Sequence, residues 1–220
     1  MIKLIYHTFL NMLFPPKCPV CRCYVGQQGE WCMRCLEQVL SIRTINVRQH
    51  HLKYLDECQV LCQYRSGMKK IIQHIKFYQA LKYVPHIHWL LNREGDLVSF
   101  KCIDIVSAVP LHESRLKSRG YNQSEKIFYP WIKEKGWLWQ NLLMRKKDTV
   151  PQYELSSKER QKNIKNAFVM RPNYNIQDCT ILLVDDIFTT GVTMDECAKV
   201  LKSAGAKKVI GLALATDAEY

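Results

Sequence analysis

The feature that most constrains the fold is a short apolar run that ends in two acidic residues and a threonine-rich turn. Residues 180–184 read Thr-Ile-Leu-Leu-Val, which is typical of a buried parallel strand, and Asp185 and Asp186 follow directly. A turn with Gly191 comes next, and Thr193-Met-Asp-Glu196 has the spacing of a capping box, which predicts a helix start. Because ligands of open α/β sheets bind at the carboxyl ends of the strands, this segment predicts an α/β fold and one edge of its binding site.

The same segment carries a specific chemistry. Backbone amides and hydroxyls of residues 189–193, at a helix N-terminus, can hold a phosphate monoester. Asp185 and Asp186 can accept hydrogen bonds from two adjacent sugar hydroxyls. An ordinary strand-to-helix turn is the plain alternative, and a Walker-B strand would need a GxxxxGK[ST] loop that the sequence lacks. The segment therefore predicts a site for both ends of a ribose 5-phosphate.

Two CxxC pairs lie near the N-terminus, at Cys18 and Cys21 and at Cys32 and Cys35. Four thiolates can surround one Zn²⁺ tetrahedrally, and such a closed shell is structural and not catalytic. A redox motif is the alternative, but redox CxxC motifs occur singly beside a βαβ unit. Cys23 is close enough to substitute for a ligand but breaks the spacing. The other cysteines are scattered singly and are predicted to be small core residues: Cys58, Cys62, Cys102, Cys179 and Cys197.

The remaining pattern predicts strands that alternate with helices, which favours a parallel doubly wound sheet. Strands are expected near 60–64, 103–108 and 209–215, and helices over 68–79, from about Asn122, and over 195–204.

Charge and length limit the partners and the location. The 220 residues carry a net charge of +12, and 15 basic against 7 acidic residues lie between Lys101 and Arg171. That excess favours polyanionic partners, with a solubilising surface as the alternative. Met1 to Phe14 lacks the features of a signal peptide and is predicted to be a short amphipathic helix. No run approaches the roughly 18 apolar residues of a membrane span, so we expect a cytoplasmic chain without membrane insertion.

Residues 181–193 resemble the motif that binds phosphoribosyl pyrophosphate (PRPP) in type I phosphoribosyltransferases, with Val192 at a position that is usually small. Residues 13–21 resemble the zinc-knuckle entry of the ComF family, amidophosphoribosyltransferase-like proteins linked to bacterial DNA uptake. Lys76-Phe77 and residues 109–123 resemble further blocks of that family. Its segment ahead of the PRPP motif is matched by Thr149, Gln152, Leu155, Arg160, Asn163 and Phe168.

The resemblance implies a type I phosphoribosyltransferase-like parallel sheet flanked by helices, with a small N-terminal zinc-binding module. It implies an N-terminal helix and a four-cysteine zinc module over 1–55, and the phosphoribosyltransferase-like domain over 56–220. Mg²⁺ would accompany PRPP, and a hood from Arg145 to Arg160 would close over the site. In the hood, Ser156-Ser-Lys-Glu159 has capping-box spacing and would start a basic helix through Lys165.

The resemblance also assigns the site. Asp185 and Asp186 would be catalytic. The pyrophosphate loop would be 109–112, and Arg115 and Arg119 would clamp PRPP or a nucleic-acid backbone, with an exposed basic turn as the alternative. The residues implied to bind PRPP are Val109, Pro110, Leu111, His112, Arg115, Arg119, Thr189, Thr190, Gly191, Val192 and Thr193.

Two functions follow, and the sequence does not name an acceptor. The first is a phosphoribosyltransferase that serves DNA uptake in natural transformation, alongside other DNA-uptake proteins. The second is a non-catalytic PRPP sensor or single-stranded-DNA scaffold, in which aromatic residues near the basic stretch could stack on bases. At helical spacing most of those aromatics are expected to be core instead: Tyr121, Phe128, Tyr129, Trp131, Trp137, Trp139 and Tyr153.

Overall fold

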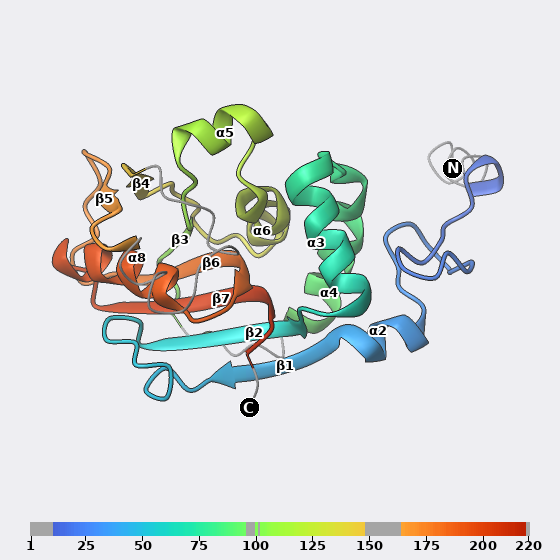
Figure 1. The fold of residues 1–220 in the computed structure, drawn as a ribbon, viewed down its shortest axis with the longest axis horizontal. Coiled ribbons are helices and arrows are strands. Elements are labelled where there is room, and N and C mark those ends of the chain that lie inside the picture. Colours follow the sequence, from blue (N-terminus) through green and yellow to red (C-terminus); the bar gives the residue numbers. More distant parts are fainter. Residues whose placement is uncertain (1–10, 96–99, 101, 148–163, 219–220) are drawn as a thin grey trace.

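The protein is built on a five-stranded sheet. The computed structural model in Figure 1 describes residues 11–95, 100, 102–147 and 164–218. The strand order is β1-β2-β7-β6-β3. The strands β2 (Glu57–Gln63), β7 (Lys208–Thr216), β6 (Thr180–Phe188) and β3 (Ile105–Ala108) are parallel, and β1 (Leu40–Ile45) pairs antiparallel with β2 at one edge. The predicted parallel α/β fold and its strands are confirmed.

Both faces of the sheet are covered, because alternate residues of each strand point to opposite sides. In β6, Leu182 and Val184 pack into one core with α3 (Ser66–Tyr78), α4 (Val84–Glu94) and α6 (Gln123–Glu134). Ile181 and Leu183 pack into the other core, with α8 (Val192–Ser203). Figure 1 shows α3, α4 and α6 grouped together and apart from α8. The sheet is therefore doubly wound, as predicted.

The shorter elements complete these layers. A hairpin of β4 (Leu143–Arg145) and β5 (Phe168–Met170) joins the core that contains α8, and the 3₁₀ turn η1 (Leu81–Tyr83) links α3 to α4. No helix in the described part of the chain is long and apolar enough to cross a membrane.

The predicted helices over 68–79 and from Asn122 are confirmed. In α3 the apolar stripe of Ile71, Ile72 and Ile75 is buried. In α6 the side chain of Asn122 accepts a hydrogen bond from the N–H of Ser124 at 3.0 Å, which caps the helix. The basic segment between these helices also forms a helix, α5 (Glu113–Arg119), which the sequence analysis did not predict.

The predicted capping box at Thr193 is wrong. The cap of α8 lies two residues earlier, at Gly191, so the helix begins at Val192, and the φ of 78° at Gly191 suits a residue without a Cβ. Asp195 is used differently: its carboxylate accepts hydrogen bonds from the backbone N–H groups of residues 53, 54 and 55 at 2.7–3.0 Å. The first turn of α8 therefore holds the β1–β2 connection in place.

The cysteine-rich segment packs on the rest of the chain. Helix α2 (Met33–Val39) buries Leu36 in the core that also contains α3 and α4. Trp31 is 1% exposed, and its indole N–H donates to the carbonyl oxygen of His86 at 2.9 Å. The division of the chain near residue 55 stays a prediction, since β1 lies before it and pairs with β2 beyond it.

The predictions for the single cysteines and for the aromatic residues are confirmed only in part. Cys58, Cys62 and Cys197 are fully buried, as predicted, but Cys102 is exposed and Cys179 only partly buried, so the core prediction is wrong for these two. Both precede a strand, Cys102 before β3 and Cys179 directly before β6, where Cys179 packs against the edge of the core around α8. Among the aromatics, Phe128 and Trp131 are core, whereas Tyr129 is 43% exposed.

Outside the described residues lie most of the predicted helix over 1–14, most of the predicted hood, the Ser156 capping box and Tyr153.

Gly29 gives a test of how the cysteine-rich segment docks. Its φ is +86°, and a Cβ there would lie 2.8 Å from the backbone oxygen of Pro85 in α4. Gly120 has a similar φ of +83° with nothing within 4 Å, so it isolates the backbone strain. We expect Gly120→Ala to lower the free energy of unfolding by about 1 kcal/mol and Gly29→Ala by about 2–4 kcal/mol, measured by urea denaturation. Equal losses would contradict the close docking.

Candidate functional site

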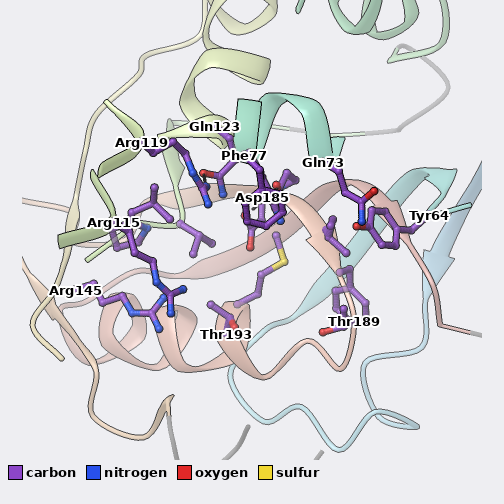
Figure 2. A pocket seen from close by; sticks show the side chains of 18 of the residues that line it. Tyr64, Gln73, Phe77, Arg115, Arg119, Gln123, Arg145, Asp185, Thr189 and Thr193 are labelled. Carbon is purple, nitrogen blue, oxygen red and sulfur yellow. Dashed lines mark hydrogen bonds and ion pairs between the residues drawn. The ribbon is translucent and has the colours of Figure 1, made fainter. Parts of the chain in front are cut away.

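A pocket of about 920 Å³ lies at the carboxyl ends of β3 and β6. Its walls come from α3, from the loop after β3, from α5 and from the turn between β6 and α8. Figure 2 shows that the two sides of the pocket differ in charge. One side carries Arg115, Arg119 and Arg145, the other carries the uncharged Tyr64 and Gln73, and Asp185 lies between them.

Most of the predicted site residues meet in this pocket. His112, Thr190 and Val192 do not line it: the His112 ring caps α5 by accepting from the N–H of Ser114 at 3.3 Å, and Val192 packs against the core around α8. Thr190 lies in the bend before Gly191. The predicted residues that line the pocket are Val109, Pro110, Leu111, Arg115, Arg119, Asp185, Asp186, Thr189, Gly191 and Thr193.

The acid pair at the end of β6 is held by contacts from three directions. The hydroxyl of Ser124, in α6, donates to Asp185 Oδ1 at 2.8 Å, and the backbone N–H of Asp186 donates to the same oxygen at 2.9 Å. From α3, the ammonium of Lys76 lies 2.8 Å from Asp186 Oδ2. These contacts fix the positions of the two carboxyl groups at the pocket wall.

The position of Asp185 changes its protonation. Burial, and then the negative charge of Asp186, raise the pKa of Asp185 to about 7, while Lys76 and the hydrogen bonds oppose the rise. Part of the Asp185 surface faces the pocket, but the carboxyl group lies deep enough for burial to dominate. Asp185 is therefore a carboxyl group that changes charge close to neutral pH.

The wall of the pocket that α5 and β4 form is cationic. Burial lowers the pKa of the Arg119 guanidinium, and the charge of Asp186 partly offsets this. Arg119 donates a short hydrogen bond to Gln123 and lies over the ring of Phe77, 5.9 Å from its centroid. Arg145 is only 8% exposed and lies over the ring of Phe168. Guanidinium groups gathered in this way suit phosphate oxygens.

Several pocket residues were not predicted as site residues. Lys69, Gln73 and Lys76 lie on one face of α3, and Arg145 comes from β4. The spacing of four and then three residues along α3 was a readable signal, because it marks one helical face beside the apolar stripe. Nothing in the sequence indicates that Ser124 would reach Asp185, 61 residues away.

A second cluster consists of the four predicted zinc ligands. The Sγ atoms of Cys18, Cys21, Cys32 and Cys35 all lie within 4.8 Å of one another. Tetrahedral Zn–S bonds of about 2.3 Å place sulfurs at such separations, so the residues fit a structural zinc ion. Cys23 is exposed beside them, with its Sγ 3.3 Å from that of Cys21.

The raised pKa of Asp185 predicts that its charge destabilises the fold. In the unfolded chain this carboxyl ionises near its ordinary pKa of 3.8, but in the folded protein only near 7. The native state therefore loses stability as pH rises through this window, by about 4 kcal/mol at most. We expect Asp185→Asn to unfold at higher urea concentration than wild type at pH 8, with a smaller difference at pH 4.5.

The exposed carboxylate variant Glu37→Gln controls for net charge. A wild-type protein as stable as Asp185→Asn at pH 8 would contradict the burial of a titrating carboxyl group.

Comparison with known proteins places the chain in a family. Residues 144–220 match the phosphoribosyl transferase domain, and residues 9–45 match the double zinc ribbon domain. Competence protein F of Haemophilus influenzae is 28% identical over 88% of this chain and 82% of its own length. DNA utilization protein YhgH of Escherichia coli K12 is 36% identical over 68% of this chain and 67% of its own length.

Among solved structures, adenine phosphoribosyltransferase of Leishmania tarentolae aligns at 11% identity and a TM-score of 0.41, over 80% of this chain and 95% of its own. The expected resemblance is confirmed by the sequence relatives and by the two domain matches, one at each end of the chain. The protein belongs to the ComF family, with competence protein F and YhgH.

Proposed function

We propose that the pocket binds PRPP together with Mg²⁺ and that the protein is a phosphoribosyltransferase serving DNA uptake. One observation carries the proposal: an acid pair, a Thr-Gly turn at a helix N-terminus and a guanidinium wall share one pocket. PRPP carries three groups that match these three features in turn: ribose hydroxyls, a 5-phosphate and a pyrophosphate. The match to a phosphoribosyl transferase domain over residues 144–220 supports it.

The 5-phosphate would sit at the N-terminus of α8. Gly191 lets the chain turn tightly there, because a Cβ would meet Phe188 and Leu52 at 2.6 Å. The backbone N–H groups of the first turn are directed at an anion, and the helix dipole favours its charge. Thr189 and Thr193 line the same region of the pocket and offer hydroxyls.

The pyrophosphate would lie between the 109–112 loop and the cationic wall. The side chain of Asn122 donates to the carbonyl oxygen of Val109 at 2.9 Å, which fixes the loop where it leaves β3. Arg115 and Arg119 lie one helical turn apart on α5, so both face the pocket. Arg145 adds a third guanidinium from β4.

The ribose would lie over the acid pair, with Asp185 and Asp186 accepting hydrogen bonds from its two hydroxyls. The pocket fits a magnesium complex of PRPP, since Mg²⁺ prefers oxygen ligands and Asp185 and Asp186 would orient the ribose hydroxyls of that complex by accepting their hydrogen bonds. When bound, Mg²⁺ supplies charge neutralisation of the leaving pyrophosphate. As an acceptor attacks C1, the C1–O bond breaks and pyrophosphate leaves with the electron pair.

A non-catalytic scaffold is the second candidate, favoured by helix α5. This helix has no buried residue and carries Arg115, Lys117 and Arg119, while Leu116 is 43% exposed. Such a surface could hold the backbone of single-stranded DNA while PRPP is only sensed. The names of the relatives, a competence protein and a DNA utilization protein, are compatible with both candidates.

Calorimetric titration of the zinc-loaded protein with PRPP and Mg²⁺ tests the proposal. We expect saturable binding, weakened at least about tenfold in Asp185→Asn, because one of the two ribose acceptors loses its charge. Asp178→Asn removes a carboxylate that is exposed and outside the pocket, and should bind as wild type does.

Wild-type protein that binds no PRPP at millimolar concentration would contradict the proposed site. It would contradict PRPP sensing as well and leave only a scaffold for single-stranded DNA, whose DNA binding should weaken steeply with added salt.

We also propose that the cysteine cluster binds one structural zinc ion. Metal binding is part of the folding free energy of such modules, so Cys32→Ser should lose the zinc and melt at lower temperature. Cys23→Ser is the matched control, since Cys23 lies outside the four-thiol cluster and should keep both. Metal analysis and a thermal melt measure the two effects. A melting temperature that stays unchanged after the zinc is gone would contradict a structural role.

A further inference from the structure

Lys76 reaches the acid pair from a helix that the PRPP motif does not include. Its ammonium lies 2.8 Å from Asp186 Oδ2, and the Asp186 side chain is only 4% exposed. That oxygen is buried and accepts no hydrogen bond of regular geometry from the part of the chain that is described. The contact is therefore chiefly an ion pair, and Lys76 is the partner that the structure shows for this oxygen.

The position of Lys76 is set by the packing of α3. Ile72 and Ile75 beside it are fully buried, so this end of the helix is anchored in the core. The Lys76 side chain is 19% exposed, which leaves its stem between α3 and the pocket with little freedom. Lys69, on the same face, instead lies over the ring of Tyr64, 5.9 Å from its centroid. Lys76 is thus the lysine of this face that contacts the pair.

Other titratable groups around the pair come from several elements, including Asp217 after β7, which lines the same pocket. Burial raises the pKa of the Tyr64 hydroxyl, just after β2, of the Cys58 thiol in β2 and of the Cys197 thiol in α8. The charges of the acid pair raise these three pKa values further. These three groups are therefore neutral at neutral pH. Arg119, in α5, is a further cation whose charge interacts with Asp186. A negative charge at the end of β6 is thus met at contact distance by Lys76.

We propose that Lys76 is the built-in counter-ion of the acid pair, a positioning residue that covers the Asp186 oxygen at which a divalent cation would otherwise bind. An ammonium and a divalent cation compete for the same carboxylate oxygen, and the one tethered to the protein is always present. The free protein therefore holds no divalent cation at the pair, and metal enters with the ligand. This inference rests on the proposed function only for the identity of that ligand.

Binding of Mn²⁺ alone, followed by electron paramagnetic resonance of the free ion, tests this without PRPP. The protein is loaded with zinc, and hard Mn²⁺ prefers oxygen ligands to the thiolate cluster. The measurement is made at about pH 8.5, above the pKa of Asp185. We expect Lys76→Met to bind Mn²⁺ at least about tenfold more tightly than wild type, because a positive charge next to the carboxylates is gone. Adding Asp186→Asn should abolish the gain, and Lys76→Arg should behave as wild type.

Lys70→Met is the matched control. It removes the same charge from the same helix, but Lys70 is exposed and lies on the wall of a different cavity. Mn²⁺ affinity of Lys76→Met equal to that of wild type and Lys70→Met would overturn the proposal. Should Lys76→Met not fold, Lys76→Gln removes the charge and keeps a hydrogen-bond donor, with the same two outcomes.

A metal-free measurement gives an independent result. The carboxyl carbon resonance of Asp185, in protein labelled with ¹³C-aspartate and assigned with Asp185→Asn, reports its titration. Its midpoint should move to higher pH in Lys76→Met and stay in place in Lys70→Met, since Lys76 opposes the rise in the pKa of Asp185. An unmoved midpoint would overturn the role of Lys76. Failure of wild-type protein to bind PRPP would contradict only the proposed function.

Discussion

Burial of β6 on both faces is the constraint from which the rest of the site follows. The strand lies between β3 and β7, and residues 181–184 have no exposed surface. A polar side chain in this stretch would have neither water nor a partner, so the acidic residues come where the strand leaves the core. Parallel pairing places the end of β3 at the same edge, which brings the 109–112 loop beside the acid pair.

The acid pair in turn determines which groups must surround it. Two carboxyl groups this close and this buried oppose each other's ionisation, and Asp185 titrates near 7 as a result. Lys76 and Ser124 stabilise the charged form from α3 and α6, two helices of the same core. The pocket thus keeps two carboxyl groups ready for a ligand at a cost in stability, a common arrangement in binding sites.

The cysteine-rich segment shares the same core and so is coupled to the helices that form the pocket. Trp31 and Leu36 pack with α3 and α4, and Gly29 lies directly against the backbone of α4. Through α3 this packing reaches Lys76. A zinc ion that orders the segment would therefore also support the helix that holds the counter-ion in place.

The sequence by itself determined the parallel fold, the four-cysteine cluster and the acid pair, because each depends on residues close together in the chain. An apolar run, a CxxC spacing and a strand-turn-helix motif are local patterns, and the structure confirms the fold and brings the four thiols together. The sequence did not identify Lys76 or Ser124 as neighbours of the motif, and it placed Arg145 in a hood over the site and not in a strand on the pocket wall. These residues come from α3, α6 and β4, and only the packing of those elements over the end of β6 decides what they touch. Even the start of α8 was misread, since Asp195 serves the β1–β2 connection and Gly191 caps the helix. Local spacing does not reveal such long-range hydrogen bonds, because their partners are fixed only when the chain folds.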